Sequence, residues 1–244
     1  MSLSATLILY HKSKRNARGK FIFFSIFFAD ASRVTEYGRI CHAKKAQNIR
    51  AKKLRGNEHG GACMPEELLV RHCAPTLASL KTGNMFACRF CTAKAMYRGI
   101  RCVNHRLAGK GLRVLPLRYR DGVGLVYVYR PGKLDADLAD TAACQLLAER
   151  GYPCGKTNLC VKHLRRRLAQ GKDFPHEIGL FLGYPPEDVA GFIDRREARL
   201  SGCWKVYGDV EAARQTFARF RKCTDVYVRQ HAGGCALERL AVAM

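Results

Sequence analysis

The sequence predicts an α+β fold built on a small mixed sheet, and three observations support this prediction. First, a β-hairpin is indicated over residues 112–130, because two apolar runs flank the turn residues Asp121 and Gly122. Second, a short apolar run and a helical stripe of apolar residues precede this hairpin. Third, the order strand, helix, hairpin, helix is that of the split βαβ unit of ferredoxin-like sheets, which we therefore expect here.

The elements before the hairpin begin with a helix, expected over Pro65–Leu80. Proline followed by two glutamates suits a helix N-terminus, and Pro75 should kink or break the helix. A short strand is expected over Met85–Arg89 and a second helix over Thr92–Leu107. The first strand of the hairpin contains Pro116, which has no N–H to donate, so we expect this strand at the edge of the sheet.

After the hairpin the sequence predicts a helical insertion and then a return to the sheet. Helices are expected over Leu134–Arg150 and Thr157–Gln170, each stopped by a glycine. Cys203–Tyr207 is expected to be the last strand of the sheet. Asp209 should cap a long C-terminal helix, and Leu237–Ala243 is expected to add a further strand.

Residues 174–193 are predicted to be two short helices joined by a sharp corner. The spacing of three residues fits a helix-turn-helix motif, namely Gly179, Gly183 and Val189. The second helix, however, would present three carboxylates to DNA phosphates, those of Glu187, Asp188 and Asp194. We therefore favour a structural role for this corner over DNA recognition.

Several sequence motifs follow one another as in a known family. They are RHCAPTLASLKTGNMF (Arg71–Phe86), NHRL (Asn104–Leu107), the corner Phe174–Ile193, CWKVYGD (Cys203–Asp209) and KCTDVY (Lys222–Tyr227). From about Met64 to the C-terminus the chain resembles the bacterial domain-of-unknown-function family 3793. The resemblance implies no established activity, cofactor or catalytic residue. It implies a connection to iron or redox physiology, because relatives are encoded near flavodoxin and iron-uptake genes.

Residues 1–63 differ in composition from the rest of the chain. They hold 7 Lys and 6 Arg, whereas residues 64–244 hold 9 Lys and 21 Arg. This contrast, together with glycine codons before Met64 that can form a ribosome-binding sequence, indicates a mis-called start and translation from Met64. A secretory signal around Phe21–Ala29 and a basic arm that binds nucleic acid are the competing interpretations. In each case we expect a disordered leader followed by a single domain over residues 64–244.

Charge and cysteine content limit the class of protein. The formal net charge is +23, and residues 64–244 contribute +13 of it. Nucleic acid, acidic proteins and anionic ligands are therefore candidate partners, with plain solubility as the alternative. The 12 cysteines are not spaced like a disulfide framework, which favours the reducing cytoplasm. No apolar run reaches the roughly 20 residues of a membrane span, so no membrane partner is expected.

Two motifs resemble ligand sites without meeting their requirements. One set has the number and pair spacing of a zinc site: Cys88, Cys91, Cys102 and His105. A helix over Thr92–Leu107 would hold Cys91 and Cys102 about 16 Å apart, so no metal is favoured and this set stays the alternative. The other motif, Gly151–Thr157, is one residue short of a P-loop.

Polar residues within the family-like motifs remain as candidate ligand-binding residues. They are His72, Cys73, Lys81, Thr82, Asn104, His105, His176, Glu177, Lys205, Tyr207 and Asp209. Two of them have an ordinary structural role as the alternative, because Glu177 is expected to cap a helix and Asp209 to cap another.

The predicted function is that of a cytoplasmic binding or accessory module for a small anionic ligand or a protein partner, connected to iron or redox physiology. One alternative is an enzyme that brings His105 or His176 together with Cys73 in one pocket. The other is a nucleic-acid-binding protein that uses residues 174–193 or a basic face around Arg165–Arg167. The sequence assigns no cofactor and does not decide whether a reaction is catalysed.

Overall fold

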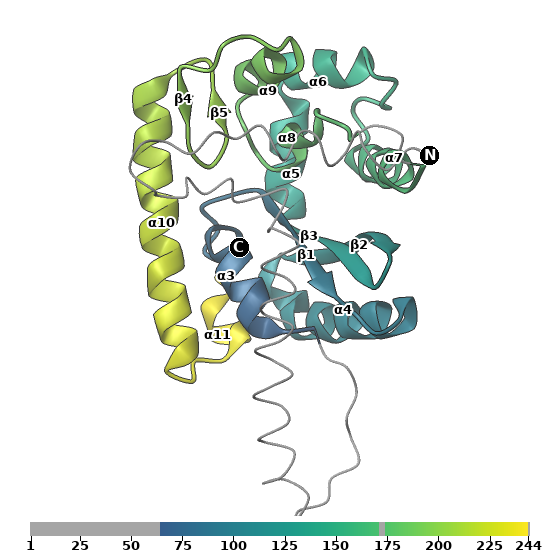
Figure 1. Cartoon of the computed structure of the whole chain (residues 1–244), viewed down its shortest axis with the longest axis vertical. Helices are drawn as coiled ribbons and strands as arrows, with labels where there is room; N and C mark the ends of the chain where they lie inside the picture. The colour runs from purple at the N-terminus through teal and green to yellow at the C-terminus, as the bar shows by residue number, and fades with distance from the viewer. Residues whose placement is uncertain (1–63, 171–173, 244) are drawn as a thin grey trace, which may run out of the picture.

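The main sheet has three strands, β1 (Gly83–Arg89), β2 (Arg113–Arg120) and β3 (Val123–Tyr129), in the order β1-β3-β2. Figure 1 shows this sheet in the computed structural model, which describes residues 64–170 and 174–243. Both strand pairings are antiparallel, so the expected mixed sheet is antiparallel throughout. The predictions made for residues 1–63 lie outside the described residues.

The hairpin and its crossover helix form the predicted split βαβ unit. Asp121 and Gly122 have φ values of 51° and 76°, the left-handed geometry that a two-residue hairpin turn requires. Helix α4 (Ala93–Leu107), capped by the Thr92 hydroxyl and followed by the single turn η1 (Ala108–Lys110), connects β1 to β2. As a result β1 and β2 run in the same direction on either side of β3.

Strand β2 lies at the edge of the sheet, as Pro116 predicts. The pairing with β3 shifts register between Pro116 and Arg118, so a bulge follows the proline. Two residues before the proline, the Asn104 side chain accepts the Val114 N–H and donates to the Val114 carbonyl, both at 2.8 Å. Asn104 thus occupies the outward N–H and carbonyl groups of Val114, and Pro116 has no N–H to offer. Both features protect this edge of the sheet from pairing with another strand.

One face of the sheet packs against helices from both ends of the described chain. These helices are α3 (Glu66–Leu77), α4 and α11 (Leu237–Leu240), and they cover Val114, Val126 and Val128. The predicted first helix is therefore confirmed, and it ends two residues after Pro75. Burial of these branched apolar side chains favours the folded state by about 2 kcal/mol each.

The opposite face of the sheet carries a second apolar core. Helices α5 (Pro131–Ala139) and α7 (Thr157–Gln170) cover it and contact Leu117 and Tyr127 among others. The single helix expected over Leu134–Arg150 is wrong. It is interrupted at Asp140, whose side chain accepts the Ala143 N–H and so starts a new helix, α6 (Thr141–Ala148).

The predicted corner is present and consists of α8 (Ile178–Phe181) and α9 (Pro186–Ile193). Gly183 ends α8 with a left-handed φ of 72°. A Cβ placed on Gly179 would lie only 2.8 Å from the Val189 side chain, so the two helices approach closely at this glycine. The backbone shape inferred from the glycine and valine spacing is confirmed.

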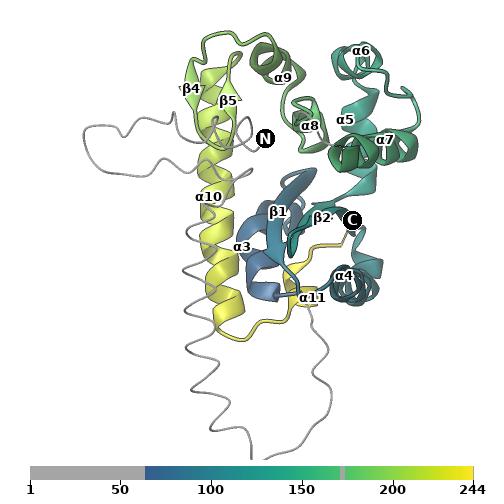
Figure 2. The ribbon, with the colours of Figure 1, turned by 45° about the vertical axis from the view of Figure 1, so that its right-hand side comes forward.

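The expected last strand of the main sheet is wrong. Part of Cys203–Tyr207 is extended, but it pairs with the preceding residues in a separate hairpin, β4 (Leu200–Ser201) and β5 (Lys205–Val206). Helix α10 (Val210–Ala232) follows, capped by Asp209 as predicted, and runs alongside α3 (Figure 2).

The expected C-terminal strand is also wrong, because Leu237–Leu240 form α11. Glu238 of this short helix pairs with Arg106 of α4, and the Val242 N–H donates to the Leu77 carbonyl. These contacts fix the C-terminal segment beside α3 and α4. Within residues 64–170 and 174–243, no helix is both long and apolar enough to cross a membrane.

Candidate functional site

The loop between α3 and β1 holds two of the candidate residues, Lys81 and Thr82, in buried positions. The Leu80 and Lys81 N–H groups both donate to the Pro75 carbonyl, at 2.8 and 3.1 Å, and Ser79 has a φ of 59°. This tight turn directs the chain back toward the sheet. It leaves the Lys81 residue only 5% exposed.

The Lys81 ammonium has no hydrogen-bond acceptor among the described residues. Its Nζ lies 4.9 Å from the centre of the Tyr184 ring, a cation–π contact. Burial lowers the pKa of Lys81 to about 8, and the nearby Cys203 and Cys73 thiols oppose this shift only in part. A buried lysine without a carboxylate partner is costly for the fold, and such groups mark candidate functional sites.

Aromatic side chains form the wall beside this lysine. The Tyr184 ring stacks on Trp204 with centroids 4.9 Å apart, and its hydroxyl donates to the Cys203 carbonyl at 3.3 Å. Trp204 in turn lies edge-on against Phe217 of α10, at 4.6 Å. Tyr184 and Trp204 are half-buried and Phe217 is buried. The site lies between the corner, the β4–β5 turn and α10, and the two half-buried residues are partly open to solvent there.

Two cations, Lys81 and Arg221, act on the Cys203 thiol at this site. Burial raises the pKa of the Cys203 thiol, while the cations Lys81 and Arg221 lower it, which places both cations within electrostatic range of that sulfur. The ionisable groups that act on Lys81 itself are two thiols and no carboxylate. The described surroundings therefore leave its positive charge uncompensated.

The buried carboxylate of Asp188 positions the β4–β5 hairpin at this site. It accepts the indole N–H of Trp204 at 2.7 Å and the backbone N–H groups of Tyr207 and Gly208 at 2.6 and 3.0 Å. Asp188 is 3% exposed, so it is not presented to solvent as a recognition-helix residue would be. The Gly208 N–H is likewise used inside the protein and does not point at a ligand.

A second anchor joins the corner to the lysine loop. The Thr82 hydroxyl donates to Asp137 of α5 at 2.5 Å. Gly183 of the corner lies directly against this threonine, since a Cβ on the glycine would be 2.7 Å from the Thr82 hydroxyl. Burial raises the pKa of Asp137, and the threonine hydrogen bond lowers it.

Of the candidate residues on α3 and α4, only Cys73 lies near Lys81. Cys73 is fully buried near Lys81, and burial raises the pKa of its thiol far above the usual range. His72 points elsewhere and stacks on Phe86 with centroids 5.5 Å apart. Asn104 binds the edge of β2, and His105 is exposed on α4.

Candidate residues near the corner have other contacts. The exposed His176 lies edge-on against Phe192, and Lys205 lies over the same ring at 5.5 Å. Tyr207 packs closely on Gly191 of α9, since a Cβ on that glycine would be 2.4 Å from the tyrosine ring. Asp209 caps α10.

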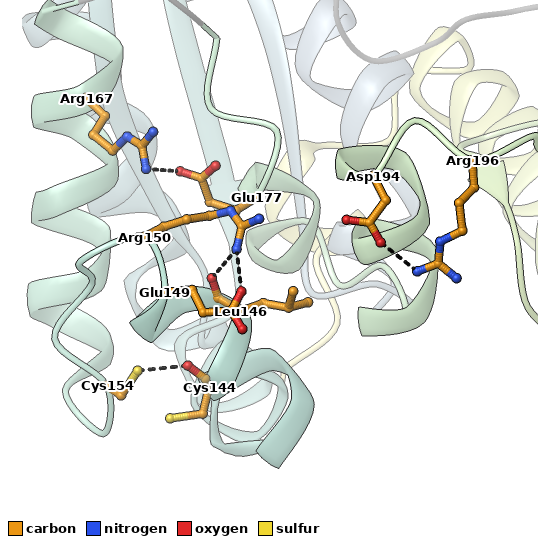
Figure 3. A network of polar contacts seen from close by, with 9 residues as sticks. All are labelled: Cys144, Leu146, Glu149, Arg150, Cys154, Arg167, Glu177, Asp194 and Arg196. Carbon is orange, nitrogen blue, oxygen red and sulfur yellow. Dashed lines mark hydrogen bonds and ion pairs between the residues drawn. The ribbon is translucent and has the colours of Figure 1, made fainter.

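Glu177 makes no helix cap, which corrects that expectation. It is 3% exposed and accepts the Tyr152 hydroxyl at 2.7 Å. It also pairs with the Arg167 guanidinium at 2.7 Å (Figure 3). This buried carboxylate joins the start of α8 to α7. Its charge is therefore compensated, in contrast to that of Lys81.

The alternative metal set does not converge in the structure. Cys88 is buried, where burial raises its thiol pKa to about 11, whereas Cys91, Cys102 and His105 are exposed. No group of three or more His, Cys, Asp or Glu side chains among residues 64–170 and 174–243 is arranged to hold a metal ion. The described residues therefore offer no ligand set for zinc.

A cavity of about 530 Å³ lies where α7 begins, next to the segment that is one residue short of a P-loop. Lys156 and Asp135 contribute its charged groups, and Cys154 and Cys160 line its inner part. The Cys154 thiol donates to the Cys144 carbonyl at 3.0 Å (Figure 3). Burial raises the pKa of Cys154 to about 11, so this thiol is protonated at neutral pH.

Sequence reasoning missed five members of the lysine site: Tyr184, Asp188, Cys203, Trp204 and Arg221. The first four fall within the family-like motifs, which was the available signal, and Arg221 directly precedes the last motif. Only polar residues were selected from those motifs, so the aromatic wall was passed over. Asp188 was selected only as a group that opposes DNA.

The comparisons with known proteins concern the same part of the chain. A family model described as "Protein of unknown function (DUF3793)" matches residues 69–241. A search of curated proteins finds no match, and a search of solved structures finds none. Because the match spans well over half of the sequence, from α3 to α11, the chain belongs to this family of proteins of unknown function.

Proposed function

We propose that this protein binds a small anionic ligand at the site around Lys81. The observation that carries the proposal is Lys81, a residue only 5% exposed, whose ammonium lies over the Tyr184 ring and has no hydrogen-bond acceptor among the described residues. A buried charge without a partner destabilises a fold, whereas a bound anion would accept its N–H groups and neutralise it. The ligand would thus supply what the surrounding side chains lack.

The neighbouring groups limit the chemistry of the ligand. Lys81 and Arg221 supply positive charge, and Tyr184 and Trp204 supply an aromatic wall. Burial raises the pKa of Tyr184 well above its usual value, so its phenol stays neutral, and its hydroxyl proton is used in the hydrogen bond to the Cys203 carbonyl. A carboxylate or phosphate group fits this set of donors, and the low exposure of Lys81 favours a small ligand.

The test uses Trp204, the single tryptophan of the chain, as a fluorescent reporter beside the site. Titration with inorganic phosphate or acetate should change its emission in a saturable manner. Lys81→Met should abolish the response, and Lys222→Met, which removes an exposed lysine of α10, should retain it. Equal responses in the two variants would contradict the proposal.

The pH dependence of binding gives a second readout. Because the pKa of Lys81 is about 8, the protonated fraction falls about tenfold per pH unit well above that value. The affinity for acetate, which stays ionised throughout, should therefore be constant between pH 6 and 7 and decline through pH 8 to 9. A pH-independent affinity would assign binding to an arginine instead.

The other functional hypotheses have less support. An enzyme with a His/Cys pocket would need His105 or His176 beside Cys73, yet both histidines are exposed and the cysteine is buried. DNA recognition by residues 174–193 would present Glu187 and Asp194, both exposed, to phosphates. A protein partner, the cytoplasmic location and the connection to iron or redox physiology stay predictions.

A further inference from the structure

Positive charge is concentrated on three elements, α4, β2 and α7. Together they hold 11 of the 30 Lys and Arg residues of residues 64–244 and none of the 17 Asp and Glu residues. Figure 1 shows α4 and α7 below and above β2 on one side of the molecule, and Figure 2 shows the same arrangement. The surplus charge of the described chain is therefore gathered in one region.

These three elements share one continuous surface. Helices α4 and α7 cover opposite faces of the sheet, and both pack against the edge strand β2. The Arg165 guanidinium of α7 donates to the Tyr97 hydroxyl of α4 at 3.4 Å, so the two helices meet at this point. Tyr97 is 45% exposed although it is a large aromatic residue.

The exposed cations of this region define the basic surface. They are Lys94, Arg98 and Arg101 on α4, Arg113, Arg118 and Arg120 on β2, and Lys162, Arg165 and Arg166 on α7. Arg120 shares the exposed carboxylate of Asp121 at 3.4 Å. Arg106 and Arg167 are left out of the set because each is paired with a carboxylate from another element.

The type of partner follows from what this surface offers. Strand addition at β2 is opposed by Asn104, which binds the outward groups of Val114, and by Pro116, which has no N–H. The surface thus offers side chains and not a free strand edge. Arginine forks suit phosphate oxygens, and an exposed aromatic ring among them suits an unpaired base.

We infer that the basic surface binds single-stranded nucleic acid, with phosphates on its arginines and a base stacked on Tyr97. Every nucleotide of such a ligand carries one phosphate, which matches a surface of nine exposed cations, of which Arg120 is paired with Asp121. This site is separate from Lys81 and from the corner at residues 174–193. Its success or failure is therefore independent of the proposed anion site.

The test measures fluorescence anisotropy of a labelled single-stranded RNA of about 20 nucleotides with the full chain. The triple variant Arg98→Gln, Arg101→Gln, Arg165→Gln should weaken binding by about tenfold or more at moderate salt. The slope of log affinity against log salt should fall by about 2, since each lost phosphate contact contributes about 0.7 on single strands. The charges of residues 1–63 are common to all variants.

The matched control removes three exposed arginines of α10: Arg214→Gln, Arg219→Gln, Arg229→Gln. It has the same net charge and should bind almost as tightly as the unchanged protein. Equal loss in the two triple variants would overturn the proposal, because binding would then depend on net charge alone. Circular dichroism spectra would establish that both variants are folded.

Variants of Tyr97 distinguish binding of nucleic acid from binding of other polyanions. Tyr97→Ala should weaken RNA binding about fivefold or more, and Tyr97→Phe, which keeps the ring, should not. If polyglutamate competes with RNA and is equally sensitive to the triple variant and to Tyr97→Ala, the partner is an acidic protein and the proposal is wrong. Tighter binding of the corresponding duplex would also overturn it.

Discussion

Arg130 and Lys81 are the two cations whose side chains are buried among the described residues, and they lie on either side of the same loop. Arg130 follows β3, is 0% exposed and donates to four backbone carbonyls, those of Thr76, Leu77, Lys110 and Val242, at 2.7 to 3.0 Å. Its own N–H donates to the Thr82 carbonyl, next to Lys81. Lys81 is almost as buried but has only a ring face as partner.

The two buried cations differ in their hydrogen-bond acceptors, and this difference distinguishes a structural charge from a candidate functional one. The planar guanidinium has five N–H donors, and the carbonyls at the ends of α3, η1 and the C-terminal segment are arranged to accept them. Those carbonyls would lack partners without Arg130. No backbone carbonyl among the described residues depends on Lys81 for its hydrogen bond. Replacing Lys81 should therefore raise the free energy of unfolding, while it removes the proposed contact with an anion.

The largest expected effect is that of Arg130→Met. The variant removes the charge and leaves several buried carbonyls without a donor, so we expect a loss of about 4 kcal/mol in the free energy of unfolding. Urea denaturation followed by circular dichroism measures this loss. Arg130→Lys keeps the charge but has fewer donors in a different geometry, and it should recover only part of the stability.

A control for Arg130 is available on the same sheet. Arg113→Met removes an exposed arginine at the start of β2, opposite Tyr129 of β3. It should change the free energy of unfolding by about 0.5 kcal/mol or less. If Arg130→Met were equally mild, the four hydrogen bonds would not hold the two ends of the described chain together.

The next effect is the pH dependence of Lys81→Met. The folded-state pKa of Lys81 is about 8 and its ordinary value is 10.5, so between these values the unfolded chain binds more protons than the folded one. As the pH rises from about 8 to 10.5, the free energy of unfolding of the unchanged protein should therefore increase, and Lys81 contributes about 3 kcal/mol to this increase. Below pH 8 the cost of burying the charge is fully present.

The measurement is the difference in unfolding free energy between Lys81→Met and the unchanged protein at several pH values. At pH 7 the variant should be more stable by about 1–3 kcal/mol, since the lost cation–π contact offsets part of the gain. The difference should vanish near pH 10.5. Taking the difference cancels the titration of the buried thiols and phenols, and a flat difference would show that Lys81 is well solvated.

The sequence predicts best what is decided by neighbouring residues. The Asp121-Gly122 hairpin, the caps Thr92 and Asp209, and the corner at Gly183 all depend on local hydrogen bonds or φ angles. Each of them is present in the structure. The crossover helix and hairpin are compatible with the order β1-β2-β3 as well as β1-β3-β2, and Pro116, which indicates an edge position for β2, selects the observed second order.

The wrong expectations concern contacts between distant segments. Cys203–Tyr207 alternates like a strand of the sheet, but Asp188 binds Trp204 and Tyr207 and keeps this segment beside α9. The C-terminal segment alternates too weakly to define a strand, and the pairing of Glu238 with Arg106 favours a helix there. No local pattern shows either partner.

The candidate site was predictable only in part for the same reason. Lys81 and Thr82 could be selected as polar residues of a motif, but burial and the lack of an acceptor depend on where the corner and the β4–β5 turn pack. Tyr184 and Trp204 belong to the site through their rings, and the contact of Lys81 with the Tyr184 ring depends on folding and not on any local sequence pattern. The basic surface was visible in sequence only at Arg165–Arg167, since α4 and β2 join it through folding.

The smallest expected effect separates the wall of the lysine site from the lysine itself. Asp188→Asn keeps one oxygen for the Tyr207 and Gly208 N–H groups but turns an N–H₂ group toward the indole N–H of Trp204. Two donors then face each other, so we expect a loss of about 2 kcal/mol and a shift in Trp204 emission. Urea denaturation and fluorescence spectra measure both.

The matched control is Asp194→Asn on the same corner. Asp194 is exposed and pairs with Arg196 at 3.0 Å (Figure 3), so its neutralisation should cost about 0.5 kcal/mol or less. If Asp188→Asn weakens anion binding without changing the pKa of Lys81, the hairpin wall contributes to the ligand directly. If anion binding is unchanged while the Trp204 emission shifts, Lys81 alone carries the affinity. The functional difference between Lys81 and Arg130 then lies only in the hydrogen-bond acceptors that Arg130 has and Lys81 lacks.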